Sequence, residues 1–295
     1  MKKPIFTGAA VAILTPFTED GINYDELGRI IDYQIDHGTD AIVIAGTTGE
    51  SATMSDEEHR AVIKYAVDKV AKRVPVIAGT GSNETAYAIE LSQYAESVGA
   101  DALLVVTPYY NKCSQAGLVK HYTAIADAVN IPIILYDVPS RTGVGIATET
   151  YVELAKHPNI AAVKEANGDL SKILRLRAAV GDDLVLYSGN DDQIVPILSL
   201  GGKGVISVLS NVAPQQAHDI CQLYFDGKVE ESAKLQIEYT DLIDALFCEV
   251  NPIPVKVAMR KLGYEAGPLR MPLCEPSAAH EQQIEQALRH HGLLK

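Results

Sequence analysis

A single lysine follows a short apolar run in the middle of the chain. The segment from Ile160 to Val163 is entirely apolar, Lys164 comes next, and polar residues begin at Glu165. A run this short between turn-forming residues predicts a buried strand with Lys164 at its carboxyl end. Burial disfavours an ammonium, so an amine there can attack a carbonyl and form a Schiff base. The alternative is that Lys164 reaches solvent while its methylenes cover apolar neighbours.

Hydroxyl and guanidinium groups follow three other apolar runs. Thr47 and Thr48 lie between two glycines after one run, Tyr110 follows another, and Tyr136 and Arg141 flank the end of a third. Hydroxyl groups can pass protons, and an arginine can hold a carboxylate through two hydrogen bonds. Each of these side chains alone is more often a packing residue, so a shared site requires a fold that brings them together.

Eight apolar, β-branched runs recur along the first three quarters of the chain. They end at Thr15, Ala45, Gly79, Val106, Asp137, Glu165, Ser188 and Val208. Amphipathic segments such as 24–37, 56–72, 84–98 and 115–128 lie between them, which is typical of strands that alternate with helices in a parallel sheet. Eight such units predict a closed (β/α)8 TIM barrel, in which polar residues at the carboxyl ends of the strands share one cavity. No G-x-G-x-x-G follows the first run, which argues against a dinucleotide-binding fold.

The strand pattern stops after Phe225. Helices are expected over 228–247, 252–262 and 276–290. The predicted division is therefore a barrel with the active site over 1–225 and a C-terminal three-helix region over 226–295. This appendage shows no evident chemistry of its own, and we expect it to cover the barrel or pack between subunits.

Composition and charge exclude several classes of function. The 295 residues include 25 basic and 38 acidic side chains, which gives a net charge of −13. Such a field repels nucleic acid and anionic membranes, so a bound carboxylate needs a local arginine or an array of N–H donors. The four cysteines form no C-x-x-C pair, the eight histidines show no metal-binding spacing, and no apolar run is long enough to span a membrane. We expect a cytoplasmic protein with reduced thiols and no metal.

Eight short motifs occur in the order and spacing of one enzyme family. They are GTTGES, GTGSN, TPYYN, YDVPSRTG, VKEANGD, YSGND, GVISV and NPIPVK. The chain resembles the dihydrodipicolinate synthase family of lysine-dependent class I aldolases, which also contains N-acetylneuraminate lyase. The resemblance covers essentially the whole chain. GTTGE and VKEANGD mark the family at large, whereas YDVPSRTG, with Arg141, is specific to the synthase branch.

The resemblance implies a lyase that forms a Schiff base between Lys164 and pyruvate and needs no separate cofactor. The resulting enamine attacks the aldehyde of L-aspartate 4-semialdehyde, and ring closure gives 4-hydroxy-tetrahydrodipicolinate, at the branch point of diaminopimelate and lysine biosynthesis. In such an enzyme Tyr136 donates and accepts protons, and Thr47 and Tyr110 relay them to solvent. Tyr110 is expected to reach in from a neighbouring subunit of a homotetramer, a dimer of dimers.

Four further positions acquire substrate-binding roles by the same resemblance. Thr48 and the backbone at Ile206 hold the carboxylate of pyruvate. The carbonyl of Gly189 lies beside the lysine, and Arg141 holds the carboxylate of the second substrate. Because the net charge of the chain is negative, this single arginine is expected to matter more for binding the substrate carboxylate.

Lysine inhibits some members of the family at a subunit interface. The residues here that fit this allosteric pocket are Ser51, Ala52, His59, Asn83 and Tyr109. Two positions depart from the pattern: Asp56 replaces a frequent histidine, and Tyr87 stands where inhibited members carry a glutamate that pairs with the amine of the effector. Loss of that carboxylate removes a charge-assisted hydrogen bond, so we expect weak or absent inhibition by lysine.

Two alternatives remain open on the sequence. Within the same chemistry, the chain could be an N-acetylneuraminate lyase or a 2-keto-3-deoxy sugar-acid aldolase, against which Arg141 and the Thr47–Thr48 pair argue. In a different class, it could be a non-catalytic pyruvate-binding barrel that kept the pocket and lost turnover. The nucleophile, the proton relay and the arginine together favour the synthase.

Overall fold

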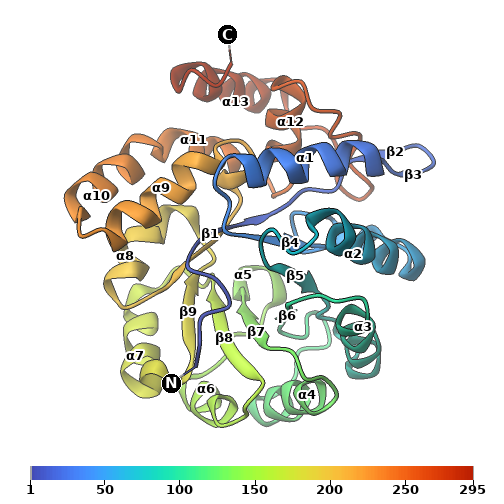
Figure 1. The fold of residues 1–295 in the computed structure, drawn as a ribbon, viewed down its shortest axis with the longest axis vertical. Coiled ribbons are helices and arrows are strands. Elements are labelled where there is room, and N and C mark those ends of the chain that lie inside the picture. The colour runs from blue at the N-terminus through green and yellow to red at the C-terminus, as the bar shows by residue number, and fades with distance from the viewer. Residues whose placement is uncertain (1, 295) are drawn as a thin grey trace.

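A closed barrel of eight parallel strands organises the chain, in a computed structural model that describes residues 2–294 (Figure 1). The strands are β1 (Gly8–Ala12), β4 (Ala41–Ile44), β5 (Val76–Gly79), β6 (Ala102–Val106), β7 (Ile133–Asp137), β8 (Ile160–Glu165), β9 (Val185–Ser188) and β10 (Gly204–Ser207). They pair in chain order, and β10 pairs with β1 to close the barrel. The predicted (β/α)8 TIM barrel is confirmed. The first strand ends at Ala12 rather than Thr15, and the other ends lie within one residue of prediction.

A ring of helices surrounds the barrel (Figure 1). Its members are α1 (Tyr24–Asp36), α2 (Asp56–Val70), α3 (Thr85–Ser97), α4 (Gln115–Asp127), α6 (Thr148–Ala155), α7 (Leu170–Val180), α8 (Ile194–Ser199) and α9 (Pro214–Phe225). Ser55 begins α2 with a capping box, in which its hydroxyl accepts from the Glu58 N–H and the Glu58 carboxylate accepts from the Ser55 N–H. A short hairpin of β2 (Phe17–Thr18) and β3 (Gly21–Ile22) precedes α1.

The C-terminal region is helical, as expected, but it is divided differently. It contains α10 (Val229–Glu238), α11 (Thr240–Leu246), α12 (Ile253–Lys261) and α13 (Ala278–His290). The helix expected over 228–247 is interrupted at Tyr239, which separates α10 from α11. The helices α12 and α13 pack on each other and lie outside the ring, at the top of Figure 1. The division of the chain at residue 225 stays a prediction.

Side chains alternate across each strand and fill two apolar layers. Ile134 and Tyr136 of β7 belong to the cluster inside the barrel, whereas Leu135 belongs to the layer between barrel and helices. Because successive side chains of a strand point to opposite faces, Tyr136 and Lys164 face the interior. By the same alternation, Asp137 and Glu165, which follow Tyr136 and Lys164 in the sequence, face the helix layer.

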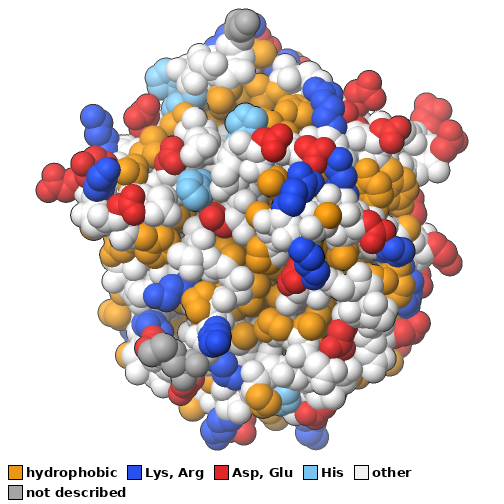
Figure 2. Space-filling model, in the orientation of Figure 1, with side chains coloured by type: hydrophobic (Ala, Val, Ile, Leu, Met, Phe, Trp, Pro, Cys, Tyr) orange, Lys and Arg blue, Asp and Glu red, His pale blue; other side chains and the backbone are white. Residues whose placement is uncertain are grey.

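The surface has a mixed charge distribution. On the face shown in Figure 2, basic side chains are interspersed with acidic and apolar ones, a pattern unlike the basic stripe of a nucleic-acid-binding surface. Within residues 2–294, no helix combines the length and apolar character that crossing a membrane requires.

Candidate active site

A cavity of about 160 Å³ lies at the carboxyl ends of the barrel strands. Loops that follow β4, β7, β8 and β9 contribute to its wall. The predicted site residues that the structure brings together there are Thr47, Thr48, Tyr136, Arg141, Lys164 and Gly189. Residues far apart in the sequence therefore meet in one cavity, as the barrel predicts.

Lys164 and Tyr136 form the centre of this cavity. They are paired residues of β8 and β7, and their side chains are almost fully buried, with exposed fractions of 6% and 7%. The Lys164 Nζ lies 4.3 Å from the centre of the Tyr136 ring, within the range of a cation–π contact. Lys164 therefore does not extend into solvent, which was the alternative on the sequence. The phenolic hydroxyl has no side-chain or backbone partner within the described part of the chain, so it is available to a bound molecule.

Gly189 allows the close approach of the strand end to the lysine. Its N–H donates to the carbonyl of Glu165 at 2.8 Å. A Cβ atom at this position would lie 3.1 Å from the Lys164 Cε and 2.7 Å from the Ala166 Cβ. A side chain here would therefore displace the lysine or its neighbour, which explains the glycine.

Asn251 connects two of the predicted carboxylate-binding residues. Its amide Nδ2 donates to the Thr48 hydroxyl at 3.0 Å, and its backbone carbonyl accepts from the Arg141 Nη2 at 3.1 Å. Its Oδ1 is buried and lacks a hydrogen-bond partner among residues 2–294. Asn251 precedes α12, in the C-terminal region for which the sequence shows no evident chemistry, so this region contributes a residue to the wall of the cavity. The only signal in the sequence was the NPIPVK motif, to which no role had been given.

A buried ion pair holds the loop that carries Thr47 and Thr48. The Lys256 Nζ of α12 lies 2.6 Å from the Glu50 Oε1, and the two side chains are 0% and 1% exposed. The ammonium also donates to the carbonyl of Pro268 at 2.8 Å. Burial lowers the pKa of the Lys256 ammonium, and the Glu50 carboxylate opposes this shift. The C-terminal helices thereby fix one side of the cavity.

Asp191 is a second residue near the cavity that was not predicted from the sequence. It is buried, and its Oδ2 accepts from the N–H groups of Val208 and Leu209 at 3.0 and 2.9 Å. Burial raises the pKa of the Asp191 carboxyl, and the charge of Lys164 is among the groups that oppose this shift. Since Val208 lines the cavity, Asp191 fixes the wall that follows β10. The YSGND motif was the signal for it.

Two predicted site residues do not line this cavity. Tyr110 is 91% exposed, has a φ of 68° and does not contribute to the wall of this cavity. Ile206 is buried in the barrel interior on β10, two residues before Val208. The functions given to Tyr110 and Ile206 stay predictions.

Comparison with known proteins identifies the family of this chain. The model of the dihydrodipicolinate synthetase family matches residues 5–291. The chain belongs to this family. A curated relative, the 4-hydroxy-tetrahydrodipicolinate synthase of Acetivibrio thermocellus, is 54% identical over 294 residues, which are 100% of either protein. The predicted family membership is confirmed.

Solved structures of dihydrodipicolinate synthases share the fold along their whole length. The enzyme from Acinetobacter baumannii, complexed with pyruvate, is 42% identical, with a TM-score of 0.94 and coverage of 98% of this chain and 99% of that one. The enzyme from Cyanidioschyzon merolae, with lysine bound, is 41% identical, with a TM-score of 0.96 and coverage of 99% and 100%.

In this dihydrodipicolinate synthetase family member, a larger cavity of about 490 Å³ shares Thr47, Arg141 and Asn251 with the first. Its wall includes four of the five residues predicted for a lysine pocket, namely Ser51, Ala52, His59 and Tyr109. Asn83 is not on this wall, and its carbonyl instead accepts from the Asn111 amide at 2.9 Å.

Tyr87 and His59 line the larger cavity, and a polar atom of each is already hydrogen-bonded within the protein. The Tyr87 hydroxyl donates to the Asp56 Oδ1 at 2.9 Å, and burial together with this bond raises the pKa of Tyr87 to about 12. The His59 Nε2 lies 2.8 Å from the Gly79 carbonyl, and burial lowers the pKa of its imidazole. Neither side chain supplies a carboxylate for the amine of an effector.

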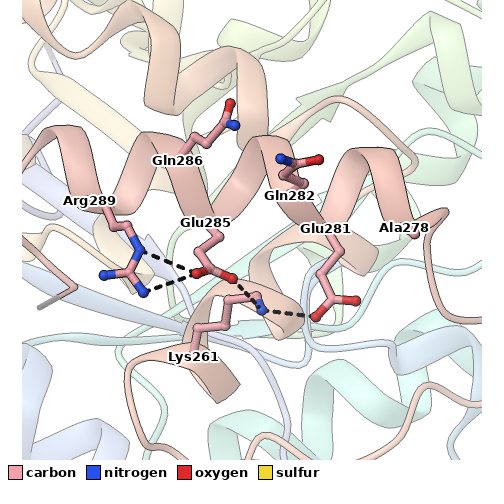
Figure 3. Close-up of a pocket in the computed structure, with 7 residues that line it drawn as sticks. All are labelled: Lys261, Ala278, Glu281, Gln282, Glu285, Gln286 and Arg289. Carbon is pink, nitrogen blue, oxygen red and sulfur yellow. Dashed lines mark hydrogen bonds and ion pairs between the residues drawn. The ribbon is translucent and has the colours of Figure 1, made fainter.

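Two polar clusters on the C-terminal helices have structural explanations. Lys261 of α12 bridges Glu281 and Glu285 of α13 at 2.9 and 3.0 Å in a shallow surface pocket (Figure 3). His290 and His291 each bond a different oxygen of the Asp241 carboxylate, at 2.8 and 2.7 Å. These three side chains could hold a metal ion, but their mutual hydrogen bonds account for the arrangement.

Proposed function

We propose that this chain condenses pyruvate with L-aspartate 4-semialdehyde to give 4-hydroxy-tetrahydrodipicolinate, a lyase reaction. The observation that carries the proposal is the buried Lys164 Nζ, 4.3 Å from the Tyr136 ring, in a cavity that also presents Thr48 and Arg141. Relatives that match over the full chain bear the name of this synthase, and one related structure holds pyruvate.

The first half of the reaction makes an imine. The amine of Lys164 attacks the ketone carbon of pyruvate, and the Tyr136 hydroxyl protonates the leaving hydroxyl, so that one water is lost. Loss of a proton from the methyl group then gives an enamine. Because the iminium nitrogen accepts the electron pair, this step requires neither a metal nor an organic cofactor.

The second half forms the ring. The enamine carbon attacks the aldehyde carbon of the second substrate, and the amino group of that substrate then attacks the imine carbon and releases Lys164. Arg141 holds the carboxylate of the aldehyde through its guanidinium. Thr48 and the backbone near Ile206 hold the carboxylate of pyruvate. The net loss is the single water that left during imine formation.

The proton path is completed by a second copy of the chain. In this proposal Thr47 lies between Tyr136 and a Tyr110 supplied by a neighbour in a homotetramer. A phenol that is 91% exposed on one chain can reach the cavity of another, which supports this arrangement. Sedimentation of the wild type against Tyr110→Ala, with activity measured at each concentration, tests the contribution of the neighbour.

Borohydride reduction in the presence of pyruvate tests the chemistry directly. Mass spectrometry should find the reduced adduct on the peptide that contains Lys164. Lys256 is the internal control, because it is also buried but is paired with Glu50. An unmodified Lys164 peptide, or modification of Lys256 alone, would overturn the proposal.

A coupled assay then identifies the second substrate. The synthase should turn over L-aspartate 4-semialdehyde and should not cleave N-acetylneuraminate or 2-keto-3-deoxy sugar acids. Trapping of pyruvate without turnover of the semialdehyde would instead indicate a binding barrel.

A further inference from the structure

A second polar pair lies directly behind Tyr136 and Lys164. Asp137 follows Tyr136 on β7, Glu165 follows Lys164 on β8, and the two acidic residues are paired across the strands. Strand alternation directs them to the outer face of the barrel. They are 0% and 1% exposed, so both carboxyl groups are enclosed between barrel and helices.

One phenol bridges the two carboxyl groups. The hydroxyl of Tyr151, a fully buried residue of α6, lies 3.2 Å from the Asp137 Oδ2 and 3.2 Å from the Glu165 Oε2. The Lys172 Nζ of α7 lies 2.7 Å from the Asp137 Oδ2. The N–H of Ile146 donates to the Asp137 Oδ1 at 3.3 Å.

The N–H of Asn167 donates to the Glu165 Oε1 at 3.2 Å. From α4, Tyr122 also faces this cluster; it is fully buried, and burial raises its pKa well above the ordinary value, so it is a neutral phenol. The charged or titratable groups around the pair are therefore Lys172, Tyr151 and Tyr122.

The number of available protons bears on the protonation state of Asp137 and Glu165. A phenol has one hydrogen to donate. Two carboxylates would have to share that hydrogen in a weaker three-centre bond, whereas a protonated carboxyl group donates a hydrogen of its own to the phenol oxygen. Since Lys172 bonds Asp137, this arrangement favours Asp137 as the anion and Glu165 as the acid.

Electrostatics agree with this assignment. Two buried carboxylates with one ammonium would leave an uncompensated negative charge, which is unfavourable in a medium of low dielectric constant. Burial and then the charge of Asp137 raise the pKa of Glu165 to about 8. Burial raises the pKa of Asp137 as well, but the Lys172 ammonium opposes that shift.

We propose that Glu165 is held protonated in the working enzyme and that the chain of hydrogen bonds from Glu165 through Tyr151 and Asp137 to Lys172 is a positioning device for Tyr136 and Lys164. It joins the carboxyl ends of β7 and β8 to α6 and α7. When the proton is lost, two anions flank one phenol, and one hydrogen bond of the chain must break. The positioning role depends on the function proposed above, whereas the proton assignment does not.

Infrared spectroscopy tests the proton assignment on the wild type. A carbonyl band of a carboxylic acid should be present at pH 7 and should disappear with a midpoint near pH 8. The band should be missing in Glu165→Gln and retained in Glu153→Gln, a matched change of an exposed glutamate. Tyr151→Phe should shift the band, because the acid loses its acceptor. A wild-type spectrum without a band that Glu165→Gln removes would overturn the assignment.

Kinetics test the positioning role. In the wild type, the rate of imine formation should decline as Glu165 loses its proton near pH 8. Glu165→Gln keeps a donor toward Tyr151 and cannot ionise. It should therefore form the pyruvate imine at pH 7 as the wild type does, without the decline near pH 8. Glu165→Ala should slow imine formation by about tenfold to a hundredfold, the effect of a small misplacement of reacting groups. An unchanged alkaline decline in Glu165→Gln, or a normal rate in Glu165→Ala, would overturn the role. Failure of the wild type to trap pyruvate would overturn the proposed function and leave the infrared assignment intact.

Discussion

Tyr136 and Lys164 are paired residues of neighbouring strands, and the lysine Nζ lies 4.3 Å from the centre of the phenol ring. The contributions of the ring and of the hydroxyl of Tyr136 can therefore be measured separately. The ring packs against the amine, whereas the hydroxyl is free to exchange protons with a substrate.

Replacing Tyr136 with phenylalanine should keep the packing and remove the proton donor. We expect kcat to fall by about 10²–10⁴-fold, the usual contribution of general acid–base catalysis. The thermal unfolding midpoint should stay near that of the wild type, since the hydroxyl bonds no other described residue. Steady-state kinetics and circular dichroism provide the two measurements, and a kcat close to that of the wild type would contradict the assigned role.

Arg141 should affect one substrate more than the other. Arg141→Ala should raise the KM for the aldehyde and leave the rate of pyruvate imine formation nearly unchanged. Arg141→Lys should recover little, because an ammonium cannot make the paired hydrogen bonds of a guanidinium. Equal losses in aldehyde use and imine formation would refute the role, and rapid-mixing absorbance separates the two steps.

The ion pair between Glu50 and Lys256 should matter to stability. Glu50→Ala leaves a buried ammonium without its partner, and such losses are about 3–5 kcal/mol in the free energy of unfolding. The double variant Glu50→Gln with Lys256→Met should be destabilised less than Glu50→Ala. Denaturant titration measures both.

The exposed pair of Lys64 and Asp68 is the control for that experiment, since these side chains are 55% and 60% exposed. Asp68→Ala should have little effect on stability. If Asp68→Ala and Glu50→Ala had equal effects, burial would not be the cause.

The free energy of unfolding should depend on pH through Glu165. Its pKa is raised from 4.5 to about 8 in the folded chain, so between these values the folded state holds a proton that the unfolded state has lost. Stability from this group is thus complete below pH 4.5 and falls as the pH rises toward 8, by at most about 1.4 kcal/mol per pH unit. Glu165→Gln should lack this component, and parallel pH profiles for the two proteins would contradict the shift.

Inhibition by lysine should be weak. By the family resemblance, Tyr87 stands where lysine-inhibited members carry an effector-binding glutamate, and its hydroxyl already donates to Asp56. Tyr87→Glu places a carboxylate on the wall of the larger cavity and should strengthen inhibition. Half-inhibition of the wild type by sub-millimolar lysine in a steady-state assay would show the prediction to be wrong.

Local sequence patterns were sufficient to predict the strands and the position of Lys164. The position of Lys164 followed from a short apolar run, and its neighbours followed from the rule that strand ends share one face of a barrel. Asn251 and Asp191 could not be found this way, since their partners lie in remote segments and only packing shows the contacts. The proton on Glu165 depends on Tyr151 and Lys172, which no motif connects to it. The role predicted for Tyr110 concerns a second chain, which one sequence does not describe.

The dependence of the cavity on Asn251 and Lys256 has a consequence for synthesis on the ribosome. All eight strands have been translated by Ser207, but the partner of Glu50 and the amide that bonds Thr48 emerge about fifty residues later. A nascent barrel therefore carries a lone Glu50 carboxylate beneath the loop of Thr47 and Thr48 until residues 251–256 have been added. Activity should arise only when the last quarter of the polypeptide has been released.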